Sequence, residues 1–477
     1  LIFDIFKTSH SYVLHIVLFV NRGTLPRTDN RKLKTLEIRR LYQKGMLSVL
    51  FSTIGTNKNS AKAEEQDQTA ITAQSSDSDL RNLVRKAFQK QLPVDQFSDD
   101  DNFLEMGGDS LRLMELVCDI EQRLGKETDL REIAVNPTIS GIADYLGKFL
   151  RGEIKEHKVD LPAECVLDEA IRPVSAYNQK PEECTKIFLT GATGFLGAYL
   201  VRAILNRKPD AVVYCHARAI SPEKAMDRIR NNMKNYHTWD DAFETRILPI
   251  CGDLSKPHLG MSDEDWAMAA KETELVIHNG AILNFVFPYE RMKPVNVTGT
   301  AEAIRFACEG RAKYFHYVSS YSAYDNPSHF GRESLEDDPL HSSEGYFLGY
   351  SETKWVAEHL VQIARERGVK ASIYRPGDIT GTLETGIWKL EDLVSRSLVG
   401  SIQMGSAPDT DIKLHLTPVD FVAEAIVAIA FQSASINHGF NLLNHHLMSI
   451  RDITKVMQEL GYDVKLLDYG EWCEQLV

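Results

Sequence analysis

The sequence predicts an α/β protein in which a doubly wound parallel sheet follows a small all-helical unit. From residue 184 to 477, short apolar β-rich runs alternate with stretches that are apolar at helical spacing, as happens when helices connect parallel strands. Residues 78–150 carry only the helical spacing. A length of 477 residues accommodates more than one domain of ordinary size.

A glycine-rich turn opens the α/β part. The strand-like run Ile187–Thr190 leads to glycines at 191, 194 and 197, and helical spacing follows over Ala198–Asn206. Strand, glycine turn and helix in this order form the front of a Rossmann unit that binds a dinucleotide. Gly191 permits the turn, Gly194 lets the backbone approach a pyrophosphate, and Gly197 lets the helix pack closely. The expected contacts are Gly191, Thr193, Gly194, Phe195, Leu196 and Gly197.

The composition restricts the partners and the compartment. A net charge of −13 without a Lys/Arg-rich block argues against nucleic-acid binding. The apolar run Tyr12–Val20 is too short to span a bilayer and lacks the features of a signal peptide, so no membrane association is expected. The seven cysteines form no C-x-x-C pair and no metal-ligand spacing. We therefore expect no metal site and a cytoplasmic location.

The first 52 residues contain a strand-like run, Val13–Val20, and a helical pattern, Leu36–Leu50. Between them, the stretch Leu25–Lys32 resembles the closing motif of acyl- and aminoacyl-adenylating domains. The resemblance implies that residues 1–52 are the C-terminal remnant of such a domain. It places Lys32 where that family has its catalytic lysine, but Arg31 replaces the usual glycine, and we expect Lys32 to be a solvated loop residue.

Two segments have linker composition. Residues 53–77 are polar without an apolar period, which predicts a disordered linker. Residues 151–183 are a mixed linker. Within its second half, the stretch Asp160–Ile171 resembles the lead-in of thioester reductase domains. The chain opens with Leu rather than Met, and its last domain lacks a closing signal, so we expect a fragment.

The helical unit, residues 78–150, centres on Gly107-Gly-Asp-Ser110. The glycines break the chain, and Asp109 and Ser110 stand at the N-cap of the next helix, for which capping alone is a sufficient explanation. However, Phe103–Leu111 in a unit of this size resembles a peptidyl or acyl carrier protein, a four-helix bundle. The resemblance implies that Ser110 carries 4′-phosphopantetheine. Apolar residues at 4-3-4 spacing predict the buried stripe of that helix: Leu113, Val117, Ile120 and Leu124.

The residue after the second strand of the α/β part selects the cofactor. The strand is predicted over Ala211–Tyr214, and Arg218 follows it. An acidic residue here would hold the ribose 2′-hydroxyl of NAD, whereas an arginine would pair with a 2′-phosphate. The sequence thus predicts NADPH, with a plain surface arginine at a strand end as the alternative.

Two further strand ends should contact the cofactor, because ligands collect at the carboxyl ends of strands in open α/β sheets. Gly252–Leu254 follows a strand predicted over Arg246–Ile250, and Val276–Ala281 forms the next strand end. We expect the adenine near Asp253 and Leu254. The nicotinamide side should lie near Asn279, Gly280 and Ala281.

The catalytic candidates are a serine, a tyrosine and a lysine. Serines at 319, 320 and 322 follow the predicted strand Tyr314–Val318. Tyr350 and Lys354 are four residues apart on a predicted helix and therefore share a face. The Lys354 ammonium is expected to lower the pKa of the Tyr350 phenol, which makes Tyr350 a general acid, while a serine hydroxyl donates to the same carbonyl oxygen.

This order of motifs is similar to the extended short-chain dehydrogenase/reductase superfamily. More narrowly, residues 160–477 resemble the terminal thioester reductase domains of nonribosomal peptide synthetases, carboxylic acid reductases and aminoadipate reductases. The narrower resemblance rests on His278–Tyr289, Pro294–Thr300, Tyr374–Gly381 and Thr417–Ala423.

The resemblance assigns the catalytic residues as Ser320, Tyr350 and Lys354, with Tyr350 and Lys354 also beside the cofactor. The family more often has Thr at 320, and Ser319 or Ser322 could substitute. Arg375–Gly377 match the loop that closes over the nicotinamide, which adds Pro376 and Gly377 to the cofactor contacts. That family's domain usually extends past a position equivalent to 477, so residues 184–477 are expected to be truncated.

The implied function is NADPH-dependent reductive release of a carrier-tethered acyl or peptidyl thioester as an aldehyde, with an alcohol after a second reduction. The implied partners are an upstream adenylation domain, a phosphopantetheinyl transferase and the carrier-bound substrate. Three alternatives remain. The chain could be an NAD-dependent epimerase or dehydratase acting on a soluble substrate, a reductase-like module that only docks or cyclises tethered chains, or an inactive fragment.

Overall fold

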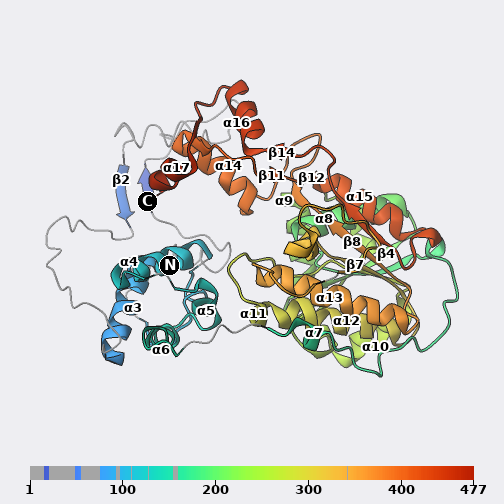
Figure 1. Ribbon diagram of the computed structural model, residues 1–477. Coiled ribbons are helices and arrows are strands. Elements are labelled where there is room, and N and C mark those ends of the chain that lie inside the picture. The colour runs from blue at the N-terminus through green and yellow to red at the C-terminus, as the bar shows by residue number, and fades with distance from the viewer. Residues whose placement is uncertain are drawn as a thin grey trace. The chain divides into compact units, whose positions relative to one another are not determined.

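The computed structural model describes residues 16–20, 49–54, 76–92, 97–108, 110–126, 128–153, 159–340 and 342–476 (Figure 1). The chain divides into two compact units. One comprises residues 1–128 and 137–153, and the other comprises residues 129–136 and 154–477.

Two strands, β1 (Ile16–Val20) and β2 (Val49–Ile54), pair antiparallel near the start of the chain. The predicted helix over Leu36–Leu50 is therefore wrong at its last two residues, and the predicted linker 53–77 is wrong at its first two. Valine, phenylalanine, threonine and isoleucine within β2 favour extended backbone, and pairing with β1 satisfies its hydrogen bonds. Residues 21–48, with Arg31 and Lys32, and residues 55–75 lie outside the described residues.

The helical region contains α3 (Asp77–Gln91), α4 (Ser110–Leu124), α5 (Leu130–Val135) and α6 (Ile139–Leu150), of which α5 is grouped with the second unit. A capping box of Ser76 and Asp79 starts α3, and Asp77 is already helical rather than linker. The predicted stripe of α4 is buried, with Leu113 and Ile120 at 0% exposure. Phe88 and Phe103 pack edge to face with ring centroids 5.1 Å apart.

Seven parallel strands form the main sheet of the second unit, in the order β13-β8-β7-β6-β3-β4-β5. The predicted doubly wound sheet is therefore confirmed. The bounds of the strands are β3 (Lys186–Thr190), β4 (Val212–Ala217), β5 (Ile247–Cys251), β6 (Leu275–His278), β7 (Tyr314–Val318), β8 (Ala371–Pro376) and β13 (Gly439–Leu442).

Helices cover both faces of this sheet (Figure 1). One apolar cluster joins the sheet to α8 (Phe195–Arg207), α9 (Pro222–Asn235) and α15 (Val419–Ala430). The other joins it to α10 (Asp263–Glu272), α12 (Gly299–Cys308) and α13 (Gly349–Glu366). Because both faces are buried, the central strands are nearly continuous runs of apolar residues.

Strand β4 extends three residues beyond the predicted end at Tyr214. Cys215 and Ala217 are buried in the apolar core, and the His216 ring nitrogen Nε2 lies 2.8 Å from the carbonyl oxygen of Leu259. This hydrogen bond allows a polar residue to continue the strand. Strand β5 is shifted by one residue from its predicted bounds, since Arg246 belongs to the preceding 3-10 turn.

The second half of the predicted linker 151–183 packs on the sheet domain instead of connecting freely. Leu161, in the short helix α7 (Leu161–Glu164), is 2% exposed and belongs to the same cluster as α12 and α13. Glu164 accepts a hydrogen bond of 3.0 Å from the Tyr289 hydroxyl, where α11 (Tyr289–Lys293) begins. Composition alone does not predict this packing, because the apolar residues of the segment contact parts of the sheet domain that are distant in sequence.

The last part of the chain forms small elements around a separate cluster of Ala407, Ile453, Met457 and Val464. Its strands pair two by two: β9 with β12, β10 with β15 and β11 with β14. The bounds are β9 (Asp378–Thr380), α14 (Leu393–Met404), β10 (Ser406–Pro408), β11 (Lys413–Leu414), β12 (Leu416–Pro418), β14 (Met448–Ser449), α16 (Ile450–Glu459), β15 (Lys465–Leu467) and α17 (Tyr469–Leu476).

Two carboxylates cover the outer side of β13, which is an edge strand of the sheet. The backbone N–H of Gly439 donates to Asp337 Oδ1 at 3.1 Å, and that of Asn441 donates to Glu336 Oε1 at 3.0 Å. These alternate N–H groups point away from β8, so the loop carrying Glu336 and Asp337 supplies the acceptors that a neighbouring strand would otherwise provide.

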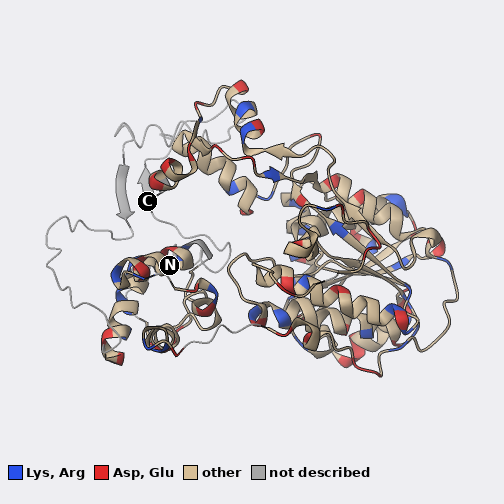
Figure 2. Ribbon diagram, in the orientation of Figure 1, with Lys and Arg blue, Asp and Glu red and all other residues tan. Residues whose placement is uncertain are grey.

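Acidic and basic residues are interspersed along the described helices (Figure 2). None of the described helices is both long enough and apolar enough to cross a bilayer.

Candidate active site

The glycine turn between β3 and α8 has the geometry of a dinucleotide cradle. Gly191 adopts φ +76°, and a Cβ atom there would lie 2.8 Å from the backbone nitrogen of Gly280. A Cβ atom at Gly197 would lie 2.0 Å from the Gly191 carbonyl oxygen, so only glycine lets α8 approach. Gly194 is the N-cap of α8 and provides no side-chain cap, which leaves helix N–H groups available to phosphates. The residues present therefore fit a nucleotide cofactor.

The other residues of the turn are close to this cradle. Thr193 is half-buried within the turn, Phe195 begins α8, and Leu196 is 8% exposed in the core beneath it. Leu254 lies against Gly280, because a Cβ atom on Gly280 would meet Leu254 Cδ1 at 2.5 Å. The structure thus brings the predicted strand end at Gly252–Leu254 next to the one at Val276–Ala281.

Arg218 is exposed and follows directly after β4. Partial burial raises the pKa of the Asp253 carboxyl, but hydrogen bonds from Ser255 and the charge of Arg218 outweigh burial and lower it. The Arg228 guanidinium donates a hydrogen bond to the Arg218 carbonyl oxygen. Arg228, on α9, is a second cation at this strand end. Sequence spacing did not indicate it.

A buried chain of hydrogen bonds runs behind the glycine turn. The Thr190 hydroxyl lies 2.9 Å from His278 Nδ1 and accepts from the Gly280 N–H at 2.9 Å. His278 Nε2 lies 3.1 Å from Thr300 Oγ1, which itself donates to the Asn296 carbonyl oxygen at 2.7 Å. This pattern assigns the neutral tautomer with the proton on Nε2.

Burial and the nearby Lys354 ammonium lower the pKa of His278 to about 3. The ring is therefore a fixed, uncharged link in the chain at neutral pH. The sequence places His278 at the start of a motif but indicates no role for it, because neither Thr190 nor Thr300 is near it in sequence. Of the predicted residues beside it, Asn279 donates to the Gly191 carbonyl oxygen at 3.4 Å, and Ala281 is exposed.

The three catalytic candidates converge at the carboxyl end of β7. Tyr350 is 7% exposed near the start of α13, and the nearby Ser320 hydroxyl acts to lower the pKa of its phenol. Lys354, 2% exposed, donates from Nζ to the Val318 carbonyl oxygen at 2.9 Å and to the Tyr317 hydroxyl at 3.3 Å. Its Nζ lies 5.8 Å from the centroid of the Tyr350 ring.

The predicted lowering of the Tyr350 pKa is wrong. Burial raises the pKa of the Tyr350 phenol well above its ordinary value, and the Ser320 hydroxyl offsets this only in part. Burial also lowers the pKa of Lys354 to about 7, against the favourable charge of Glu358. Removal from water disfavours the charged form of both groups and is the largest cause of both shifts.

The neighbouring serines have different partners. Ser319 donates to Glu358 Oε1 at 2.5 Å and is thereby turned away from Tyr350. Ser322 Oγ lies 2.8 Å from Ser320 Oγ, and the Ser322 N–H donates to the same oxygen at 3.1 Å. Of the three, Ser320 is the serine that contacts Tyr350.

The residues matched to the closing loop lie partly in the sheet. Arg375 and Pro376 belong to β8, and Arg375 is 2% exposed in an ion pair with Glu358. Gly377 follows the strand, where a Cβ atom would lie 2.7 Å from the His415 carbonyl oxygen. The predicted loop thus begins at Gly377 rather than at Arg375.

In the helical region, Ser110 is the first residue of α4, as the motif predicts for a residue at a helix start. Asp109, the other predicted cap, lies outside the described residues.

Two family models match the chain. Residues 189–426 match the family described as "Male sterility protein", and residues 79–146 match the one described as "Phosphopantetheine attachment site". The crystal structure of the terminal R domain from the myxalamid PKS-NRPS biosynthetic pathway is 39% identical, with a TM-score of 0.62, and the match covers 66% of this chain and 80% of that one.

Two curated relatives are much longer than this chain. A linear gramicidin synthase polypeptide of Brevibacillus parabrevis is 36% identical, over 80% of this chain and 8% of its own length. L-2-aminoadipate reductase of Saccharomyces cerevisiae (strain ATCC 204508 / S288c) is 31% identical, over 85% of this chain and 32% of its own length. The chain therefore spans a third or less of either relative.

The fold and the site define a Rossmann-type reductase of the short-chain dehydrogenase kind, preceded by a phosphopantetheine carrier region. The chain belongs to the family of carrier-linked terminal reductases that includes the R domains of nonribosomal peptide synthetases.

The glycine cradle can be tested with Gly197→Ala. The new methyl group would force α8 away from the turn, and overpacking of this kind costs about 1–3 kcal/mol. We expect the dissociation constant for NADPH to rise roughly tenfold or more, measured by fluorescence titration. Gly400→Ala is the matched control, because it also lies within a helix and has no atom within 4 Å of the added Cβ. Equal NADPH affinity in Gly197→Ala and the wild type would exclude this turn as the phosphate site.

Proposed function

We propose that this chain reduces a thioester tethered to its carrier region, with NADPH as the reductant, and releases the acyl or peptidyl group as an aldehyde. The observation that carries the proposal is that Ser320 lies by Tyr350 and Lys354. The three residues lie at the carboxyl ends of the parallel strands, as the glycine cradle does. Two hydroxyl donors side by side suit one carbonyl oxygen on which negative charge develops. A second reduction would give an alcohol.

When bound, the nicotinamide supplies the hydride that reduces the thioester carbonyl carbon. Ser320 and Tyr350 donate hydrogen bonds to the carbonyl oxygen, and Tyr350 gives it the proton from its hydroxyl. The carbon–sulfur bond then breaks, so that the sulfur leaves as a thiol with the hydroxyl proton and the aldehyde is released. The raised pKa of Tyr350 suits this role, because the phenol stays protonated at neutral pH and serves as an acid. The Lys354 ammonium stabilises the phenolate that remains after the transfer.

The cofactor is assigned to the residues of the cradle and the adjoining strand ends. Gly191, Gly194 and the start of α8 would hold the pyrophosphate, and Arg218 would pair with the 2′-phosphate that distinguishes NADPH. The adenine would lie by Asp253 and Leu254. The nicotinamide side would lie by Asn279, Gly280, Ala281, Tyr350, Lys354, Pro376 and Gly377, with Thr193, Phe195, Leu196 and Gly197 completing the cradle.

The domain assignment and the partners are also proposals. We assign the carrier domain to residues 78–150 and the reductase domain to residues 184–477, with Ser110 as the phosphopantetheine attachment site. Residues 1–52 resemble the end of an adenylation domain, which suits an upstream adenylation domain as supplier of the acyl group. A phosphopantetheinyl transferase would modify Ser110, and tethering raises the local substrate concentration to the millimolar range. The cysteine pattern favours the cytoplasm.

Tyr350→Phe tests the reduction itself. Without the phenolic proton, we expect NADPH oxidation with an acyl-pantetheine thioester to slow by about 10²-fold or more, followed by absorbance, with the aldehyde identified by mass spectrometry. Tyr462→Phe removes the same hydroxyl from a tyrosine that is 48% exposed, and it should keep the wild-type rate. A wild type that binds NADPH but forms neither aldehyde nor alcohol would contradict the proposed function.

Arg218→Ala tests the cofactor preference. Loss of a charge-assisted contact, worth about 1.5–3 kcal/mol, should reduce the ratio of NADPH to NADH efficiency by roughly tenfold or more. Arg202→Ala, which removes an exposed arginine from α8, should leave the ratio unchanged. An unaltered ratio in Arg218→Ala would shift the assignment to Arg228 or abolish it, and Arg228→Ala decides between these two outcomes.

Ser110→Ala tests the attachment site. Incubation of the whole chain with a phosphopantetheinyl transferase and coenzyme A should add the mass of one arm to the wild type and none to the variant. Ser98→Ala, an exposed serine of the same region, should still gain the arm. If the wild type gains no mass under conditions that load a known carrier, Ser110 is not a phosphopantetheine site.

A further inference from the structure

Glu358 continues the catalytic face of α13 into the protein interior. Tyr350, Lys354 and Glu358 are spaced four residues apart, which places them in one row along the helix. The Glu358 side chain is 1% exposed. A carboxylate at this depth needs partners that replace water, and it is retained at a large desolvation cost.

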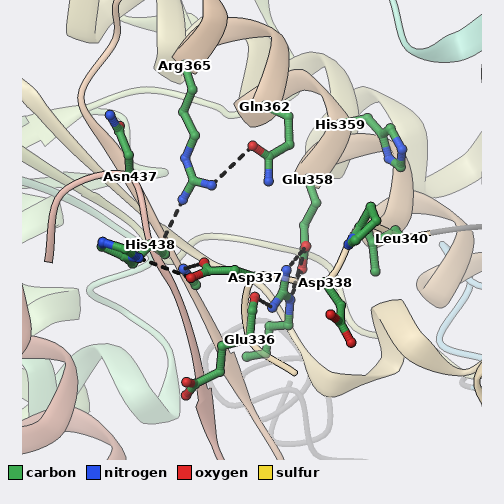
Figure 3. A pocket seen from close by; sticks show the side chains of 13 residues that line it. Glu336, Asp337, Asp338, Leu340, Glu358, His359, Gln362, Arg365, Asn437 and His438 are labelled. Carbon is green, nitrogen blue, oxygen red and sulfur yellow. Dashed lines mark hydrogen bonds and ion pairs between the residues drawn. The ribbon is translucent and has the colours of Figure 1, made fainter. Parts of the chain in front are cut away.

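Its partners come from the ends of two sheet strands, and Figure 3 shows the pocket that Glu358 lines. Oε1 accepts from Ser319 Oγ at 2.5 Å and from Arg375 Nε at 2.9 Å, while Oε2 accepts from Arg375 Nη2 at 2.7 Å and from Nε at 3.1 Å. Ser319 follows β7, and Arg375 lies in β8. Glu358 therefore clamps α13 to both strand ends, one residue away from Ser320.

The clamp is supported from its far side. The remaining Arg375 nitrogen donates to the Glu336 carbonyl oxygen at 2.8 Å, and the guanidinium carbon lies 4.8 Å from the centre of the Tyr324 ring. A cavity of about 390 Å³ adjoins Glu358 and Arg375, and Arg365, Gln362 and His438 also line it. Bidentate geometry and a stacked ring restrict Arg375, which in turn restricts the carboxylate.

Four titratable groups among the described residues interact with the Lys354 ammonium. They are Tyr350 and Glu358 on α13, Tyr317 on β7 and His278 on β6, and Arg375 on β8 pairs with Glu358. Burial raises the pKa of both tyrosines and lowers that of His278, so these three are uncharged at neutral pH. Among them, Glu358 is the group that supplies negative charge to Lys354.

We propose that Glu358 is a positioning residue for the reduction: it holds Ser320 in place through Ser319, and it supplies the counter-charge one helical turn from Lys354. This inference rests on the proposed function for its kinetic readout. Rotation of Ser319 away from Glu358 would shift the strand end that carries Ser320. Without the carboxylate charge, burial would lower the pKa of Lys354 unopposed and favour the neutral amine.

Glu358→Gln separates these two effects by pH. The pKa of Lys354, about 7 beside the carboxylate, should fall further without it, so a smaller fraction of the enzyme carries the ammonium at neutral pH. We expect the basic limb of the pH profile of kcat/KM for an acyl-pantetheine thioester to move about one pH unit toward acid. Glu358→Asp, which keeps the charge, should return the limb toward its wild-type position.

Ser319→Ala is the matched variant for the geometric part. It leaves the Glu358–Arg375 pair intact and removes one hydrogen bond, so the protein should fold even if Glu358→Gln does not. We expect kcat to fall about fivefold with the KM for NADPH and the basic limb unchanged. Wild-type kcat in Ser319→Ala, or an unmoved basic limb in folded Glu358→Gln, would overturn the proposal.

A readout without turnover distinguishes this failure from that of the proposed function. The titration of Lys354 can be followed by NMR of ¹⁵N-lysine-labelled protein, with Lys354→Met for assignment. The pKa of Lys354 should be lower in Glu358→Gln than in the wild type. If this shift is present but the wild type reduces no thioester, the proposed function fails and the effect of Glu358 on Lys354 stands. If the pKa of Lys354 is the same in both proteins and the wild type reduces thioesters, the inference on Glu358 fails alone.

Discussion

A chain of buried contacts from Thr190 to Lys354 constrains the site more than any single contact. Thr190 and Thr300 hydrogen-bond to His278, whose ring stacks on that of Tyr317 with centroids 5.9 Å apart, and the Tyr317 hydroxyl accepts from Lys354, so the glycine turn at β3 is joined to the lysine on α13. Each buried donor or acceptor in it would cost free energy if left without a partner, so the members have little freedom to move independently. The cofactor cradle and the catalytic helix are for this reason parts of one rigid assembly.

Burial also determines the charge state of the catalytic groups. It raises the pKa of Tyr350 and lowers that of Lys354, so both groups shift toward their uncharged forms before any substrate enters. A phenol that holds its proton is suited to donate it, and a lysine near its midpoint at neutral pH responds strongly to a nearby charge. Desolvation thus has the largest effect on the pKa values of Tyr350 and Lys354, and the Ser320 hydroxyl and the Glu358 carboxylate oppose it.

Local patterns in the sequence were sufficient for the architecture. The glycine spacing predicted the turn at Gly191, the alternation of strands and helices predicted the doubly wound sheet, and the four-residue spacing of Tyr350 and Lys354 predicted their shared face. What failed depended on contacts between distant segments. The pKa of Tyr350 follows from burial depth, the extension of β4 needed Leu259 as a partner for His216, and the clamp at Glu358 joins α13 to Ser319 and Arg375, which are 39 and 17 residues away. No spacing rule shows these contacts.

The covered edge of β13 affects how copies of this protein meet. A parallel sheet that ends in a bare strand can add a strand from another molecule, and growth in that direction leads to fibres or swapped dimers. Here the N–H groups of Gly439 and Asn441 are already bound to carboxylates. An incoming strand would have to displace two hydrogen-bonded anions and would meet their negative charge. The loop at Glu336 and Asp337 thus protects this edge of the folded sheet against self-association.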